Sequence, residues 1–217
     1  TAWEGYEEIP SWIMQGYASM GLEAIEQLED EVPTHVFLQA GVGSLAGGVS
    51  GLLANYYGDK KPMIVVVEPN EADCIYRTAE AKDGGLHFVT GSMPTIMAGL
   101  ACGEPNTISW DVLTEVADYA VSCPDWVAAE GMRILGNTVG DDPKVISGES
   151  GAVTTGLVAA VMSRDDLAWL RKELKLDKDS RVLCFSTEGD TDADNYRRIV
   201  WEGQDPSTVD QTGTYEA

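Results

Sequence analysis

The sequence predicts an α/β protein in which a parallel sheet is flanked by helices. Short apolar runs over 35–40, 63–67 and 181–185 are typical of strands buried inside such a sheet. Helical periodicity precedes and separates these runs. It begins over about 11–30, where apolar side chains recur every three or four positions. Glycine-rich turns follow the first strand and precede a later helix, as expected where the chain changes direction.

The remaining elements are also predicted from periodicity. Helical patterns extend over 44–57, 71–80, 93–101, 109–118, 124–135, 152–163, 165–174 and 192–201. Residues 1–203 are expected to form the folded part of the chain. Residues 204–217, rich in Asp, Ser, Thr and Gly, are expected to form a flexible tail.

Composition excludes several classes of function. The formal net charge is −22, from 14 Lys+Arg against 36 Asp+Glu, so nucleic acid and anionic membranes are poor partners. No apolar run approaches the roughly 20 residues that cross a bilayer. The four cysteines show no CxxC spacing and there are only two histidines, so we expect no metal site and no disulfide framework. A reducing cytoplasm fits this usage.

The first candidate site is the loop Ala40-Gly41-Val42-Gly43-Ser44, which joins strand 35–40 to the following helix. Glycines let the backbone approach a phosphate closely, and the helix start offers free N–H groups. Two alternatives stay open from spacing alone. One is a tight turn with close packing at Gly47, and the other is a nicotinamide-dinucleotide site of an oxidoreductase, with Glu68 as the ribose-binding acid.

A second candidate group follows the last strand. Ser186 and Thr187 could hydrogen-bond a buried heterocycle, or they could cap the next turn. Glu149, inside the glycine-rich turn 147–151, could be a site carboxylate, or an acid favoured in the first turn of a helix. Ligands of open α/β sheets sit beyond the carboxyl ends of strands, where the loop at 40–44 and Ser186 are both expected.

A family resemblance rests on motifs that cover nearly the whole chain up to Gly203. They include Thr1-Ala2-Trp3-Glu4-Gly5-Tyr6, Ile9-Pro10-Ser11-Trp12-Ile13-Met14-Gln15-Gly16-Tyr17, Leu38-Gln39-Ala40-Gly41-Val42-Gly43, Val67-Glu68-Pro69, Asp73-Cys74-Ile75-Tyr76-Arg77, 95–105, 146–152 and 186–192. In this order they closely resemble the diaminopropionate ammonia-lyases. These are fold type II pyridoxal-phosphate enzymes, akin to threonine dehydratase and the tryptophan synthase β chain.

The resemblance implies a function in amino-acid catabolism. Members remove both amino groups of 2,3-diaminopropionate, giving pyruvate and ammonia, with pyridoxal 5'-phosphate as cofactor. By motif, Ala40 to Ser44 would hold the cofactor phosphate, and Ser186 would face the pyridine nitrogen with Thr187 beside it. Glu149 would lie near the ring, and Glu68 would be structural. The resemblance also implies a homodimer.

One family feature is not matched. The Schiff-base lysine of the family belongs to a motif upstream of the matched region, and none of the seven lysines has that context. We therefore expect an incomplete C-terminal fragment that contains no catalytic residue of its own and no lyase turnover. A non-catalytic binding domain that has lost its first part is the remaining alternative.

Overall fold

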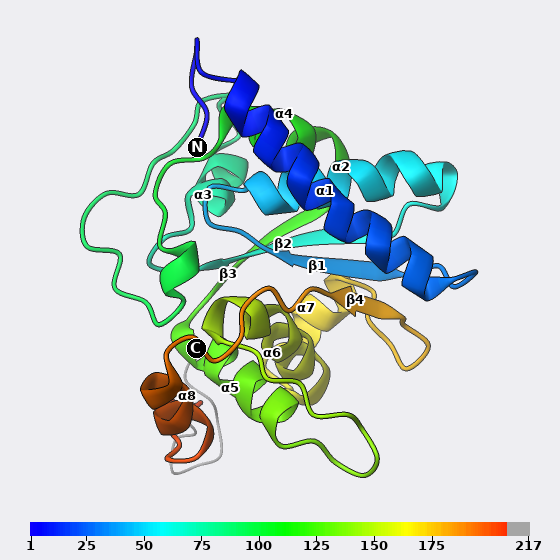
Figure 1. Ribbon diagram of the computed structural model, residues 1–217, viewed down its shortest axis with the longest axis vertical. Coiled ribbons are helices and arrows are strands. Elements are labelled where there is room, and N and C mark those ends of the chain that lie inside the picture. Colours follow the sequence, from blue (N-terminus) through cyan, green and yellow to red (C-terminus); the bar gives the residue numbers. More distant parts are fainter. Residues whose placement is uncertain (208–217) are drawn as a thin grey trace. The chain divides into compact units, whose positions relative to one another are not determined.

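The computed structural model describes residues 1–207 and divides the chain into two compact units (Figure 1). The first unit comprises residues 1–95, 99–122 and 180–184. The second comprises residues 96–98, 123–179 and the chain from 185 onward. The predicted flexible tail falls largely on 208–217, outside the described residues.

The sheet has four strands in the order β3-β2-β1-β4. Its strands are β1 (His35–Gln39), β2 (Met63–Pro69), β3 (Tyr119–Cys123) and β4 (Val182–Cys184). The central strand β1 pairs in parallel with β2 on one side and with β4 on the other, so that Phe37 lies opposite both Val65 and Cys184. All five residues of β1 are buried, which explains why this strand is a continuous apolar run in the sequence.

Four α-helices belong to the first unit: α1 (Glu8–Leu28), α2 (Ser44–Tyr57), α3 (Cys74–Ala81) and α4 (Thr107–Val116). Helix α2 contacts β1, α1 and α4, and Figure 1 shows α1, α2 and α4 over the same face of the sheet. The chain steps from β1 to β2 to β3 in one direction, and right-handed crossovers place the connecting helices on one side. A short 3-10 turn, η1 (Gly58–Lys60), follows α2.

The second unit contains α5 (Asp125–Gly136), α6 (Glu149–Ser163), α7 (Ala168–Glu173) and α8 (Ala193–Val200). Helices α5 and α6 cross at two glycines. A Cβ at Gly156 would overlap the carbonyl oxygen of Val127, and a Cβ at Gly131 would overlap that of Ala152. The two backbones therefore touch directly.

Most predicted elements are confirmed within a few residues, but two predictions were wrong. The helix expected over 93–101 is only the 3-10 turn η2 (Ala98–Leu100). Left-handed backbone at Gly91 (φ +111°) and Met93 (φ +44°), followed by Pro94, interrupts any helix there. Strand β3 was missed because it lies at the sheet edge and is mostly half-buried, so it has no continuous apolar run.

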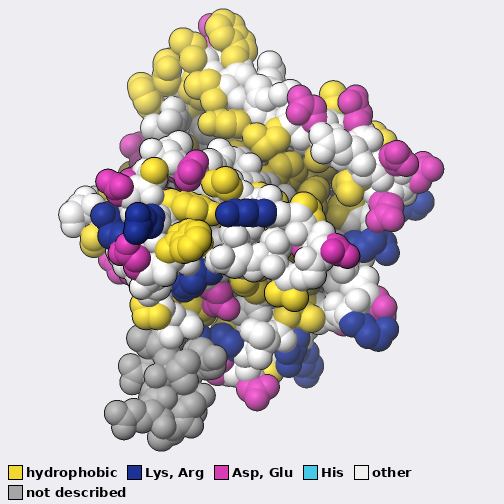
Figure 2. All heavy atoms as spheres, turned by 60° about the horizontal axis from the view of Figure 1, so that its bottom comes forward, with side chains coloured by type: hydrophobic (Ala, Val, Ile, Leu, Met, Phe, Trp, Pro, Cys, Tyr) yellow, Lys and Arg dark blue, Asp and Glu magenta, His cyan; other side chains and the backbone are white. Residues whose placement is uncertain are grey.

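Charged side chains of both signs are visible on one face of the molecule (Figure 2). On the face drawn in Figure 2, acidic and basic side chains are interspersed and neither sign forms one large patch. Among residues 1–207, no helix has the length and apolar character needed to cross a membrane.

Candidate functional site

The glycine loop leaves the sheet at its topological switch point. After β1 the chain builds β2 and β3 on one side, and β4 is then added on the other side of β1. Open α/β sheets bind ligands beyond the strand ends at this point, where the connections diverge. Ala40 to Ser44 follow β1 directly, so the position predicted for this loop is confirmed.

Gly43 gives the loop its shape. Its φ of +95° is left-handed, and it is the N-cap of α2. A Cβ at this position would lie 2.7 Å from Ile75 Cδ1 and 2.9 Å from Ser109 Oγ. Both the backbone conformation and the available space therefore require glycine.

The start of α2 can receive an anion. The first hydrogen bond inside the helix runs from Gly47 N–H to Gly43 O (2.8 Å), so the N–H groups of 44–46 precede the helical ladder. Gly43 has no side chain with which to cap them. Such groups, together with the positive end of the helix dipole, are suited to a phosphate.

Close packing at Gly47, one of the alternatives to a phosphate site, is present as well. A Cβ on Gly47 would lie 3.1 Å from Ser109 Cα and 3.1 Å from Met14 Cε. Helix α2 therefore approaches α4 and α1 closely one turn after the loop. This packing fixes the direction of α2 and leaves the N–H groups at its start in place.

Asn106 supports the loop from the N-terminus of α4, a role that was not predicted from the sequence. It is 1% exposed, its N–H donates to Val42 O (2.8 Å), and its Nδ2 donates to Ser44 Oγ (2.8 Å). Its Oδ1 accepts from the N–H groups of Ile108 and Ser109, which caps α4. An asparagine just before a helical pattern is a recognisable cap signal, although that signal does not reveal the contact with the loop.

Glu68 is interior and braces a helix. It is fully buried and accepts hydrogen bonds from Ile75 N–H (2.9 Å) and Tyr76 N–H (2.7 Å) in the first turn of α3. Burial raises the pKa of its carboxyl to about 8. A side chain enclosed in this way cannot reach a ribose. Glu68 therefore cannot be the ribose-binding acid that a dinucleotide site requires.

In the second unit, the segments around Ser186 and Ser147 are held together. Ser186 Oγ donates to Ser147 Oγ over 2.9 Å. Gly148 N–H donates to Glu188 O (2.9 Å), and Ser150 N–H donates to a carboxylate oxygen of Glu188 (3.0 Å). Ser147 and Glu188 thereby position the predicted site residue Ser186. Both lie inside motifs that carry the resemblance, but no role was predicted for either from the sequence.

Glu149 is the first residue of α6 and is only 9% exposed. Its carboxylate accepts a hydrogen bond from Asn195 Nδ2. Burial raises the pKa of Glu149, and the nearby carboxylates of Glu188 and Asp192 raise it further. A perturbed carboxyl of this kind is a common feature of functional sites.

The predicted site residues are divided between the two units. Ala40 to Ser44 belong to the first, whereas Glu149, Ser186 and Thr187 belong to the second. Ser186 and Thr187 are exposed. Within residues 1–207, no three His, Cys, Asp or Glu side chains group closely enough to hold a metal ion.

The chain thus combines an α/β fold with a glycine turn at the switch point of the sheet, an arrangement suited to a phosphate-bearing ligand. The chain belongs to the pyridoxal-phosphate dependent enzyme family, which matches residues 4–188. It is 54% identical over 206 residues to the diaminopropionate ammonia-lyase of Escherichia coli (strain K12), covering 94% of this chain and 51% of that protein. The chain spans about half the length of the curated relatives it matches.

Solved structures agree with this assignment. The crystal structure of diaminopropionate ammonia-lyase from Escherichia coli, in complex with an aminoacrylate-PLP azomethine reaction intermediate, has a TM-score of 0.87. It is 52% identical and covers 95% of this chain and 52% of that one. Threonine deaminase isoform 2 from Solanum lycopersicum, 18% identical with a TM-score of 0.68, covers 86% of this chain and 48% of that one and shows the shared fold alone. The predicted family and fold class are confirmed.

Proposed function

We propose that residues 1–203 form the cofactor-binding part of an enzyme that converts 2,3-diaminopropionate and water into pyruvate and two molecules of ammonia. The observation that carries this proposal is the left-handed Gly43 turn at the start of α2, at the switch point of the sheet. The 54% identity to a diaminopropionate ammonia-lyase supports the choice of reaction. The substrate class is a small amino acid.

The residues suited to hold pyridoxal phosphate fall into two groups. The N–H groups of Ala40 to Ser44 and of the first turn of α2 receive the phosphate, because Gly43 and Asn106 fix their direction. By the family resemblance, the Ser186 hydroxyl would be the partner of the pyridine nitrogen, with Thr187 as an adjacent candidate. When bound, the cofactor supplies an electron sink for the negative charge that develops at Cα.

A hydroxyl opposite the pyridine nitrogen suits this chemistry. Ser186 Oγ can donate or accept, and Ser147 Oγ lies 2.9 Å away as its partner within the second unit. A neutral group of this kind does not force the ring nitrogen to stay protonated, as a carboxylate would. Glu149, whose pKa is raised by burial, is the acidic group assigned near the ring.

The chain on its own is proposed to have no lyase turnover. Lysine forms the Schiff base in this family and commonly serves as the Cα base. None of the seven lysines lies in the motifs assigned to the cofactor, and Lys61 donates to Asp118 (2.7 Å) and to Val116 O (2.9 Å). The residues described here bind and orient, and the covalent step requires a lysine from the family's upstream motif.

The homodimer is proposed to use the exposed side of α1. From Ile9 to Leu22 this helix has no charged residue, although Trp12 is 57% exposed and Ile13 is 51% exposed. Two copies that each carry a net charge of −22 repel one another, so a neutral apolar face is where they can meet. A cytoplasmic location is supported by the four cysteines, all of which are free thiols.

Ligand titration tests the cofactor assignment. The purified chain should bind pyridoxal phosphate saturably in equilibrium dialysis, and Gly43→Ala should weaken that binding. Binding of NAD without binding of pyridoxal phosphate would contradict the assignment and favour the dinucleotide interpretation.

Activity measurements test the reaction. The family's lysine-containing upstream sequence, joined to Thr1, should give pyruvate from 2,3-diaminopropionate in preference to serine or threonine. Substantial pyruvate release by the 217-residue chain alone would overturn the proposed need for the lysine.

Light scattering tests the dimer surface. Trp12→Glu should shift the chain toward monomer, whereas Trp169→Glu, at a tryptophan 66% exposed in the second unit, should not. A protein that is already monomeric at high concentration contradicts the proposed contact.

A further inference from the structure

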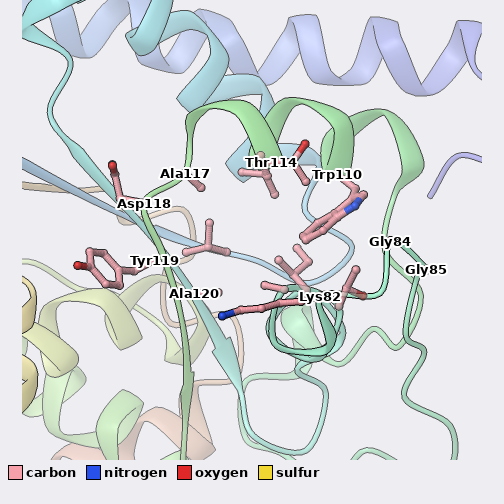
Figure 3. A pocket seen from close by; sticks show the side chains of 14 residues that line it. Lys82, Gly84, Gly85, Trp110, Thr114, Ala117, Asp118, Tyr119 and Ala120 are labelled. Carbon is pink, nitrogen blue, oxygen red and sulfur yellow. The ribbon is translucent and has the colours of Figure 1, made fainter.

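A cavity of about 440 Å³ opens in the first unit between α3, α4 and β3 (Figure 3). No residue of the loop at 40–44 lines it. Its apolar floor includes Val66, Ile75 and Leu113, each at most 2% exposed. The volume lies within the range of about 300–1,000 Å³ that is typical of small-molecule pockets.

Lys82, an exposed residue at the end of α3, lines this cavity. Its backbone is left-handed (φ +50°), a strained conformation for a residue with a Cβ. The turn that follows is fixed by Asp83, which accepts from Gly85 N–H (2.9 Å) and pairs with His87 Nε2 (3.0 Å). In Figure 3 the lysine side chain runs from α3 toward the strand that carries Ala120.

The charge of Lys82 is not compensated by the other residues that line the cavity. The only other charged side chain there is Asp118. Its carboxylate already accepts from Lys61 Nζ (2.7 Å) and from Ile64 N–H (2.8 Å). The cavity therefore offers one ammonium group above apolar walls, in a chain of net charge −22.

An aromatic side chain lines the same cavity. Trp110, on α4, is half-buried, and its ring lies on the α4 side, across from Lys82 (Figure 3). The indole offers a flat apolar surface, and the Thr114 hydroxyl one turn later offers a polar contact. A ligand that matches these walls has an apolar body and one negative charge.

We propose that this cavity binds a small monocarboxylate with an aromatic or branched apolar body. Its carboxylate pairs with Lys82, and its body packs against Trp110 above Ile75 and Leu113.

The floor of the cavity also contacts the phosphate loop. Ile75 Cδ1 and Leu113 Cδ1 lie 2.7 and 3.6 Å from the position that a Cβ on Gly43 would occupy. The apolar part of a ligand that packs against these two side chains would change the packing around Gly43, which shapes the loop. The cavity is therefore a regulatory site for cofactor binding. This role rests on the proposed cofactor role of Ala40 to Ser44. The coupling is reciprocal, so each ligand changes the affinity for the other by the same factor.

Phenylacetate is the probe, and its uncharged counterpart phenylacetamide is the matched control. Calorimetry of the full chain should show saturable binding of phenylacetate and weaker binding of phenylacetamide. Lys82→Gln should weaken phenylacetate binding about threefold, because Lys82 is exposed and solvent screens its charge. Lys82→Arg and Lys144→Gln should retain it, because the first keeps the charge and Lys144 is an exposed lysine of the second unit.

The outcomes separate this site from the cofactor site. Equal binding of phenylacetate by Lys82→Gln, or no saturation at millimolar concentration, overturns the proposal. If pyridoxal phosphate does not bind, the cofactor assignment fails while the phenylacetate titration still decides on the cavity. If both bind, phenylacetate should change the affinity for pyridoxal phosphate in the unmodified chain and not in Lys82→Gln, and an unchanged affinity overturns the regulatory role.

Discussion

Asn106 Nδ2 donates a hydrogen bond to Ser44 Oγ over 2.8 Å, although the two residues are 62 positions apart in the sequence. The same asparagine caps α4 with its Oδ1. One buried side chain therefore fastens the start of α4 to the start of α2. The direction of the N–H groups assigned to the phosphate depends on this contact.

Replacing Asn106 should affect stability and phosphate binding together. Asn106→Ala removes a helix cap and the bond to Ser44, which should cost about 1–3 kcal/mol in the free energy of unfolding. Urea denaturation measures the stability, and dialysis with pyridoxal phosphate measures the affinity. Asn55→Ala, at an exposed position of α2, should change neither. A variant with normal stability and normal affinity would show that the contact is dispensable.

Gly43 should not tolerate a methyl group. Gly43→Ala places a Cβ against Ile75 and Ser109 in a left-handed backbone, and should destabilise the chain by about 2 kcal/mol or more. The matched control is Gly16→Ala, since nothing lies within 4 Å of a Cβ at that position of α1. That change should stabilise the helix by about 0.5–1 kcal/mol. Thermal unfolding of the two variants compares them directly, and equal shifts would be inconsistent with the loop geometry.

Glu68 should make the stability of the chain fall as the pH rises. Its pKa is about 8 in the folded chain against an ordinary value of 4.5, so folding takes up a proton between these values. Its stabilising contribution is therefore full below pH 4.5 and is lost as the pH rises to about 8, by up to about 1.4 kcal/mol per pH unit.

The comparison with Glu68→Gln isolates this effect from the other carboxylates. Urea unfolding of both proteins at pH 5, 7 and 9 should show the difference, wild type minus variant, decreasing with pH. The substitution also disturbs the bonds to Ile75 and Tyr76, but that loss does not depend on pH. A difference that stays constant, or that grows with pH, would mean that Glu68 is ionised in the interior.

Glu149 should respond in opposite directions to two neighbours. The hydrogen bond from Asn195 lowers its pKa, so Asn195→Ala should raise the pKa further. The charge of Glu188 raises the pKa of Glu149, so Glu188→Gln should lower it. Carbon NMR of the Glu149 carboxyl measures both shifts. Movement of the pKa in the same direction in both variants would contradict the arrangement around α6.

The sequence was informative wherever one local rule decided the structure. Helix α2 was predicted with its observed bounds, since a glycine turn starts it and Gly58, with a φ of +52°, ends it. Strand β1 was predicted because it is central in the sheet and all five of its residues are buried, which makes it an apolar run. The loop at 40–44 was located because glycine spacing is a local signal.

Features that depend on distant parts of the chain were not predictable. Whether the loop at 40–44 belonged to a dinucleotide site depended on the direction of Glu68, and only packing against α3 fixes that direction. Asn106 and Ser147 act through partners 62 and 39 positions away, and no periodicity encodes such contacts. Strand β3 was missed because its half-buried position at the sheet edge leaves no continuous apolar run between the helices predicted over 109–118 and 124–135.

The inward direction of Glu68 also affects which class of phosphate-bearing ligand the glycine turn can accept. A glycine turn of this kind can serve a nucleotide or a simple phosphate ester, and the acid at the next strand end is what recognises a sugar. Here two backbone N–H groups hold that acid inside the protein, so no sugar can compete for it without unfolding the start of α3. The rotamer of Glu68 thus decides whether the turn can serve a nucleotide or only a simple phosphate ester. Substitutions in the first turn of α3 that release this side chain would be the simplest change from one ligand class to the other.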